Sequence, residues 1–228
     1  MTFWFAAGTT PHGARSIALT GADVTETATG CDSAPVIRVG ESEPERLPAP
    51  VLPRTGSCVP DWVQDQPADR ISGWVRLWVA GALTDRTSWD GVICATYGEV
   101  THWIEISAEE AISSRSALTL RMQSALGGHE TASSRAVADS LSRPERLASD
   151  LRAAELSGDG TATTGHLIGV ELAATRPYWL GRDVCVISSH SALYADALAG
   201  QGVPVFQCDP EAMLLKGLAV LARMRGFA

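Results

Sequence analysis

The sequence has 228 residues and a single lysine, Lys216, among its 18 basic residues. A phosphate-binding loop of the Walker type needs a Gly-Lys-Ser/Thr sequence, and Lys216 follows Leu215, so that class of ATPase is excluded. Schiff-base chemistry would depend on Lys216 alone. Its place in a helical pattern is typical of a solvated side chain instead.

Other features that the sequence lacks exclude further classes of protein. The five cysteines form no Cys-x-x-Cys pair, and an odd number is untypical of a secreted disulfide framework. The histidines have no ligand spacing such as His-Glu-x-x-His, so no metal site is predicted. No apolar run approaches the roughly 20 residues that cross a bilayer, and the N-terminus has no signal-peptide pattern. A net charge of −8 disfavours nucleic acid and anionic membranes as partners. We therefore expect a soluble cytoplasmic protein.

Short apolar runs alternate with turns and with longer helical patterns, an order that predicts an α/β protein. The proline-rich stretch from Glu41 to Pro67 is expected to be an irregular loop, because proline lacks a backbone donor. Strands are expected over Thr2–Ala7, Arg15–Leu19, Gly91–Thr96, Thr101–Ser107, Asp183–Ser188 and Val203–Gln207. Helices are expected over Ile71–Ala82, Glu109–Leu126 with Ser107 as its N-cap, Ala136–Leu156, Gly165–Arg176 ending before Pro177, Ala192–Ala199 and Pro210–Arg225.

The sequence contains an internal repeat: two turns that begin with glycine, each between two apolar strands. The first turn begins Gly8-Thr9-Thr10, and the second is Gly98-Glu99-Val100-Thr101. Two such hairpins facing each other could hold a nucleotide, with backbone N–H groups aimed at its phosphates. Two ordinary turns are the alternative interpretation.

Three segments carry a resemblance to a known family: Ser88–Ile104, Gly165–Leu172, and the tail from Val184 to Leu218. Together they resemble the 2-dehydro-3-deoxygalactonokinase family of sugar-acid kinases. The family has D-G-x-I-x-x-P-G-T-H-S/T-K-W-V in the first segment and G-L-L-I-G-A-E-V in the second. The resemblance is firm from about Trp89 onward and loose before it.

The resemblance implies an α/β fold of the actin-like (ribonuclease H-like) two-lobed ATPase type. A shortened N-terminal lobe would cover residues 1–88 and a C-terminal lobe residues 89–228. The implied activity is transfer of a phosphoryl group from ATP, with Mg²⁺, to the 6-hydroxyl of 2-dehydro-3-deoxygalactonate. The implied partner is thus a small-molecule sugar acid. A homodimer is compatible with the sequence.

The resemblance also implies residues for ligand binding, each at a position that matches the family pattern. Nucleotide contacts are implied for Gly8, Thr9, Thr10, Gly98, Thr101 and Ser188. Arg15 matches an arginine expected to meet the substrate carboxylate, a role that suits its paired donors; a surface arginine is the alternative. No catalytic residue is assigned.

The departures from the family pattern fall on polar functional positions. The family begins D-W-G-T/S-T, with an aspartate expected to organise magnesium, where this sequence has Ala6-Ala7-Gly8-Thr9-Thr10. In the second hairpin Glu99 replaces a threonine and His102 a lysine. Glu99 would repel the phosphates of ATP, and His102 is mostly neutral at pH 7. We therefore expect a degenerate active site with weakened activity; a catalytically inactive relative that binds a ligand or regulates a partner is the alternative.

Some residues have a structural interpretation that competes with a functional one. Trp103 is expected in the core, Asp209 as the cap of the last helix, and Asp90 in the turn that opens the second half. Glu171 lies in an apolar helix, where a charge is rarely buried without a partner. It either braces the nucleotide cleft or pairs with an arginine such as Arg176.

Overall fold

The computed structural model of the protein describes residues 1–25, 34–86 and 88–228, so that Cys31 lies outside the described residues. The chain divides into two compact units. Unit 1 consists of Met1–Asp90, Glu105–Ser114 and Cys208–Ala228, and unit 2 of Gly91–Ile104 and Arg115–Gln207. Strands and helices are mixed in both, which confirms the α/β class. The actin-like arrangement with lobes 1–88 and 89–228 stays a prediction.

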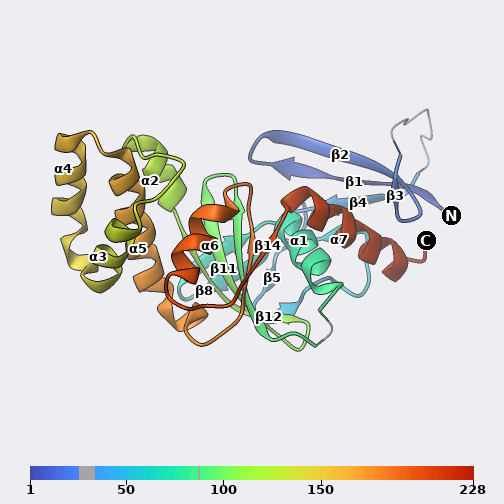
Figure 1. The fold of residues 1–228 in the computed structure, drawn as a ribbon. Helices are drawn as coiled ribbons and strands as arrows, with labels where there is room; N and C mark the ends of the chain where they lie inside the picture. Colours follow the sequence, from blue (N-terminus) through green and yellow to red (C-terminus); the bar gives the residue numbers. More distant parts are fainter. Residues whose placement is uncertain (26–33, 87) are drawn as a thin grey trace. The chain divides into compact units, whose positions relative to one another are not determined.

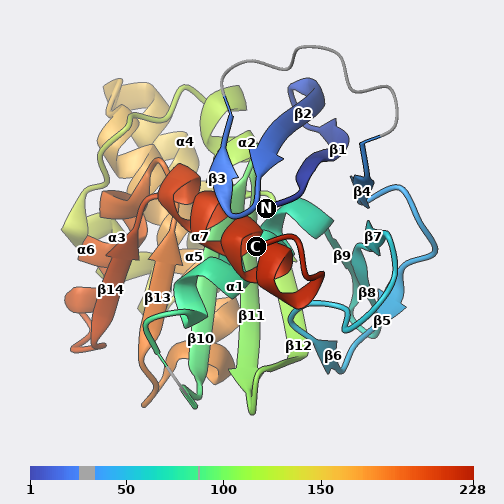
Figure 2. The same ribbon diagram turned by 90° about the vertical axis from the view of Figure 1, so that its right-hand side faces the viewer.

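Unit 1 contains a five-stranded sheet in the order β3-β2-β1-β4-β7 and a three-stranded sheet in the order β5-β8-β9. Helices α1 and α7 lie against each other, as Figure 2 shows. The elements are β1 (Phe3–Thr10), β2 (Gly13–Thr20), β3 (Asp23–Val24), β4 (Val36–Val39), β5 (Glu45–Arg46), β6 (Ala49–Pro50), β7 (Cys58–Val59), β8 (Trp62–Asp65), β9 (Ala68–Ile71), α1 (Gly73–Leu83) and α7 (Pro210–Met224).

Strand β1 alternates between buried and less buried residues, because one face of a sheet covers the core. Trp4, Ala6 and Gly8 lie on the buried face. The strand runs on to Thr10, so the predicted turn that begins Gly8-Thr9-Thr10 is shorter than expected: only Pro11 and His12 separate β1 from β2.

The stretch from Glu41 to Pro67 is not wholly irregular, as the prolines had suggested. It contains four short strands, β5 to β8, three of them only two residues long. Pro50 lies in β6, which pairs with the start of β12 at the end of a sheet. An edge strand tolerates proline because one side of its backbone needs no ladder partner.

Unit 2 contains the strands of a sheet in the order β14-β13-β10-β11-β12. Its helices are α2 to α6 and the 3₁₀ helix η1. Helices α3, α4 and α5 lie side by side (Figure 1). The elements are β10 (Gly91–Tyr97), β11 (Val100–Ser107), β12 (Glu110–Ala117), α2 (Thr119–Ala125), α3 (Ser134–Ser142), the 3₁₀ helix η1 (Pro144–Arg146), α4 (Leu147–Ser157), α5 (Gly160–Trp179), β13 (Val184–Ile187), α6 (Ser191–Ala199) and β14 (Val205–Cys208). Strands β11 and β12 contribute residues to both units.

The predicted helix over Glu109–Leu126 is wrong in its first half. Residues 110–117 form strand β12, and only Thr119–Ala125 is helical. The glutamate and alanine residues there favour a helix locally, but a two-residue turn after β11 returns the chain as a paired strand. Sheet pairing overrides a weak local propensity. Ser107 accordingly ends a strand and caps no helix.

Helix α5 continues through Pro177 to Trp179, whereas the sequence predicted an end before the proline. Proline removes one backbone hydrogen bond inside a helix. Here it lies close to the end of the helix, and the indole Nε1 of Trp179 donates to the carbonyl of Leu172 at 2.9 Å. The last turn is thereby held by a side chain.

The predicted cap of the last helix is confirmed: the Asp209 carboxylate accepts from the backbone N–H of Ala212 at 2.8 Å, with Pro210 at the first helical position. The ammonium group of Lys216 pairs with Asp85. In the described parts of the chain, no helix combines the length and the apolar composition that crossing a membrane requires.

Candidate functional site

The first predicted hairpin, β1–β2 in unit 1, uses its own polar groups to hold the turn. The Thr10 hydroxyl donates to the carbonyl of Gly13 at 2.9 Å and accepts from the backbone N–H of His12 at 3.2 Å. The carbonyl of Thr9 accepts from the indole of Trp74 at 3.1 Å. Thr9 itself is exposed.

Gly8 has a packing reason to be glycine. Strand β1 runs parallel to β4, with Gly8 opposite Val39. A Cβ atom added to Gly8 would lie 2.0 Å from the carbonyl oxygen of Val39, far inside van der Waals contact. The strand pairing alone accounts for this glycine, whatever else its backbone contacts.

The residues of this hairpin do not fit a magnesium ion. The position that the resemblance assigns to the family aspartate is occupied by Ala6, whose side chain is fully buried in β1. Magnesium prefers carboxylate and water oxygens, and a buried methyl group offers neither. Within residues 1–25, 34–86 and 88–228, no group of three or more His, Cys, Asp or Glu side chains could hold a metal ion.

Arg15, the predicted substrate arginine, lies on β2 and already has a carboxylate partner. One guanidinium nitrogen is 2.7 and 2.9 Å from the two carboxylate oxygens of Glu211, at the start of α7. Its guanidinium also lies 5.8 Å from the centre of the Trp74 ring. The Arg15 side chain is 36% exposed and that of Glu211 58%, so the pair contributes at most about 1 kcal/mol to stability.

The second predicted hairpin joins β10 to β11 in unit 2. Gly98 has a φ of 62°, the left-handed region that a tight hairpin turn requires of its first central residue. Glu99 follows, and its carboxylate lies 3.4 Å from Nε of Arg121 on α2. The expected negative charge at this hairpin is thus balanced by a neighbouring cation, which the sequence pattern did not indicate.

Thr101, also expected to contact the nucleotide, has a fully buried side chain. Its hydroxyl is 2.6 Å from the hydroxyl of Tyr194 on α6. Tyr194 in turn donates to one carboxylate oxygen of Glu171 at 2.9 Å, and the indole of Trp103 donates to the other at 2.7 Å. These four residues form a buried polar network that joins β11, α5 and α6. Trp103 is a core residue, as predicted.

Burial dominates the electrostatics of this network. It raises the pKa of the Glu171 carboxyl above its ordinary value, against the opposing effect of hydrogen bonds from Thr119, Trp103 and Tyr194. It also raises the pKa of Tyr194 and of Cys94 well above their ordinary values, and the charge of Glu171 adds to both shifts. The hydrogen-bond partners of Glu171 are the Thr119 hydroxyl, an indole and a phenol rather than the exposed Arg176.

Ser188 follows β13, whose carboxyl end lies beside that of the parallel strand β10. The Ser188 hydroxyl accepts from Thr96 at 2.5 Å and from the backbone N–H of His190 at 2.8 Å. Ligands of open α/β sheets bind at the carboxyl ends of the strands. His102, at the position of the family lysine, is buried, with Nδ1 2.6 Å from the Ser116 hydroxyl.

The structure brings Gly98, Thr101 and Ser188 together in unit 2, around the ends of β10 and β13, and leaves Gly8, Thr9, Thr10 and Arg15 on one hairpin of unit 1. Sequence reasoning missed Tyr194, Thr96 and Arg121. A lone tyrosine, threonine or arginine carries no periodic signal, so nothing in the pattern could single them out.

Two comparisons with known proteins found a similarity, one to a protein family and one to a solved structure. The model of the family described as 2-keto-3-deoxy-galactonokinase matches residues 77–221. Among solved structures, the crystal structure of a protein from Sinorhizobium meliloti, described as a candidate 2-dehydro-3-deoxygalactonokinase, is similar with a TM-score of 0.75. The two chains are 17% identical, and the similarity covers 98% of each. At 17% identity this similarity shows a shared fold and nothing more. A comparison with curated proteins found no match.

Proposed function

Since the chain belongs to the 2-keto-3-deoxy-galactonokinase family, whose model covers more than half of it, we propose that it is a sugar-acid kinase with weakened activity. The reaction would move the γ-phosphoryl group of ATP to the 6-hydroxyl of 2-dehydro-3-deoxygalactonate. A bond forms between that oxygen and the γ-phosphorus, the bond to the β–γ bridging oxygen breaks with departure of ADP, and the hydroxyl proton passes to solvent.

Several features of the described residues support this assignment. The turn at Gly98 carries backbone donors suited to phosphate, and the repulsion expected from Glu99 is reduced by Arg121. Because the side chains of Thr101 and Ser188 are buried and hydrogen-bonded, we assign them a role in positioning the backbone around a nucleotide. Gly8, Thr9 and Thr10 would contribute backbone groups and the Thr9 hydroxyl.

The weakening rests on one observation, the buried Ala6 at the position of the family aspartate. The family as a whole implies ATP and Mg²⁺. The first hairpin has no carboxylate for the metal, so we assign no step to an ion held there. Phosphoryl transfer depends on positioning and charge stabilisation, and the loss of one such group commonly costs about 10²–10⁴-fold in rate.

We expect slow turnover of 2-dehydro-3-deoxygalactonate in an assay that couples ADP release to NADH oxidation. The rate should lie above the background without sugar acid and about 10²–10⁴-fold below that of a family member with the aspartate. A rate equal to that of such a member would contradict the weakening. Turnover indistinguishable from background would exclude the kinase.

In that last case the alternative, an inactive relative that binds a ligand, becomes the better interpretation. Its support is that Arg15, Thr101 and Ser188 already bond within the protein. Calorimetric titration distinguishes a relative that binds nucleotide from one that binds the sugar acid. Heat on addition of magnesium-ATP indicates a retained nucleotide site, and heat with the sugar acid alone indicates a substrate site.

Arg15 offers a second test of the proposal. If its guanidinium binds the substrate carboxylate, Arg15→Ala should raise KM for the sugar acid by about 10–100-fold, since a hydrogen bond to a charged group contributes about 1.5–3 kcal/mol. Thermal stability should hardly change. The matched control is Glu211→Gln, which frees Arg15 and should leave KM equal or lower. An unchanged KM in Arg15→Ala would show that the Glu211 pair is the whole role of this arginine.

A further inference from the structure

A cavity of about 430 Å³ lies within unit 1, between the later turns of α1 and α7, residues 50–54 and the turn between β11 and β12. Its volume is within the range of small-molecule sites, about 300–1,000 Å³. No residue that we expect to bind nucleotide or sugar acid lines it. The cavity is therefore separate from the site described above.

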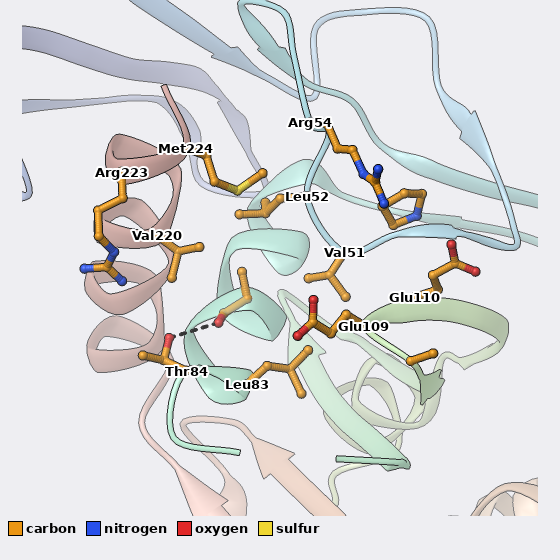
Figure 3. Close-up of a pocket in the computed structure, with 13 residues that line it drawn as sticks. Val51, Leu52, Arg54, Leu83, Thr84, Glu109, Glu110, Val220, Arg223 and Met224 are labelled. Carbon is orange, nitrogen blue, oxygen red and sulfur yellow. Dashed lines mark hydrogen bonds between the residues drawn. The ribbon is translucent and has the colours of Figure 1, made fainter. Parts of the chain in front are cut away.

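The lining of the cavity is mostly apolar, with a few charges. Figure 3 shows the side chains of Val51, Leu52, Leu83, Val220 and Met224 around it. An apolar surface of this kind favours a ligand with a hydrocarbon or aromatic body, because its burial contributes about 25 cal/mol per Å².

A carboxylate faces this apolar surface. Figure 3 shows the Glu109 carboxylate turned toward the part of the cavity that Val51 and Leu83 line, whereas the Arg223 guanidinium points away. Within the parts of the chain that the structure describes, Glu109 forms no ion pair with a basic side chain. Glu110, Arg54 and Arg223 also line the cavity, but the Glu109 carboxylate is the charge that faces its apolar part, where it can accept a cationic group of a ligand.

The position of Glu109 is fixed by its backbone. Ala108 and Glu109 have φ angles of 50° and 62°, a region that side chains other than glycine rarely adopt. The backbone N–H of Ala108 donates to the Asp90 carboxylate at 3.0 Å, and the carbonyl of Glu109 accepts from the N–H of Val51 at 3.1 Å. The turn is held on both sides, so little ordering of the backbone remains when a ligand binds.

We propose that this cavity binds a small amphiphilic amine, with its apolar body among Val51, Leu83 and Val220 and its ammonium group on the Glu109 carboxylate. Neither the ligand nor the site depends on the proposed kinase function, and no covalent step is involved.

The test uses three probes of one skeleton, titrated into the full-length protein by calorimetry or ligand-observed NMR. The probes are 4-phenylbutylamine, 4-phenylbutanol and 4-phenylbutyrate, which share a phenyl ring on a four-carbon chain and end in a cationic, a neutral and an anionic group. We expect a Kd of about 1 mM or tighter for the amine, and binding about 10-fold tighter than that of the alcohol, as for one charge-assisted hydrogen bond. This preference should shrink at 1 M salt, where the Debye length is about 3 Å.

Two variants and a control keep the result interpretable. Glu109→Gln should remove the preference for the amine and leave the alcohol unchanged, whereas Glu145→Gln, an exposed glutamate in η1 of unit 2, should change nothing. Val220→Trp should fill the cavity and weaken all three probes, at a position that is only partly buried. Equal binding of amine and alcohol, tighter binding of the butyrate, an amine preference that survives Glu109→Gln, or no binding at all would overturn the proposal.

Discussion

Replacing Glu171 with alanine is expected to lower the free energy of unfolding by about 2–4 kcal/mol. The side chain is buried and accepts from Trp103 and Tyr194 at 2.7 and 2.9 Å. Its removal leaves an indole N–H and a phenol without their acceptor, together with a cavity where the carboxylate was. Chemical denaturation followed by tryptophan fluorescence would measure the loss.

Glu171→Gln is the matched control. The amide can still accept from Trp103 and can donate to Tyr194, which then donates to Thr101, so these partners remain satisfied. It also removes the unfavourable burial of a charge. We therefore expect this variant to be as stable as the original at pH 7, or more so. Stability within about 1 kcal/mol of the original in Glu171→Ala would contradict the network's role.

The stability of the original protein and that of Glu171→Gln should also differ in their dependence on pH. The pKa of Glu171 is raised in the folded protein above its ordinary value of 4.5. Between these two values the folded state binds more protons than the unfolded one, so the contribution of Glu171 to stability falls as pH rises. Glu171→Gln lacks this contribution, and its advantage over the original should grow from about pH 4.5 upward.

Glu171 illustrates what the sequence could predict of the site. A charge in an apolar helix predicts a buried, partnered side chain, and the structure confirms the burial. The sequence could not choose its partners, because Trp103 and Tyr194 lie on elements 68 and 23 residues away. Long-range partners follow from tertiary packing, which local periodicity does not report.

The same limit explains the main error in the fold. Residues 110–117 carry glutamate, alanine and arginine, which favour a helix by a few tenths of a kcal/mol each. Pairing as strand β12 outweighs that sum. By contrast, the boundaries of α6 and α7 were predicted within two residues, since capping and apolar spacing are local signals.

Gly8 is a third case, in which the sequence singles out the residue for one role and the structure gives another reason for glycine at that position. The sequence singled it out for phosphate binding through its resemblance to a kinase motif. The structure shows that β4 leaves no room for a side chain there. A motif residue can therefore survive for packing even where the neighbouring functional side chain is absent, as at Ala6.

Gly217→Ala is expected to lower the free energy of unfolding by about 3 kcal/mol or more, because two helix backbones touch at this point. A Cβ atom on Gly217 of α7 would lie 1.9 Å from the carbonyl oxygen of Leu77 on α1. The contact is reciprocal, since a Cβ atom on Gly81 of α1 would lie 2.0 Å from the carbonyl oxygen of Met213. Neither atom is the end of a flexible side chain, so the helices must move apart.

This separation would expose part of a helix that is apolar almost all round: ten residues of α1 are buried. Gly81→Ala should therefore have an effect similar to that of Gly217→Ala, and the double variant should lose less than the sum, because the first change already separates the helices. Gly200→Ala is the control, since its φ is −61° and the nearest atoms to a Cβ are 3.4 and 3.5 Å away. Its stability should stay within about 1 kcal/mol of the original. If thermal denaturation gave Gly217→Ala the same midpoint as Gly200→Ala, α1 and α7 could not be in backbone contact.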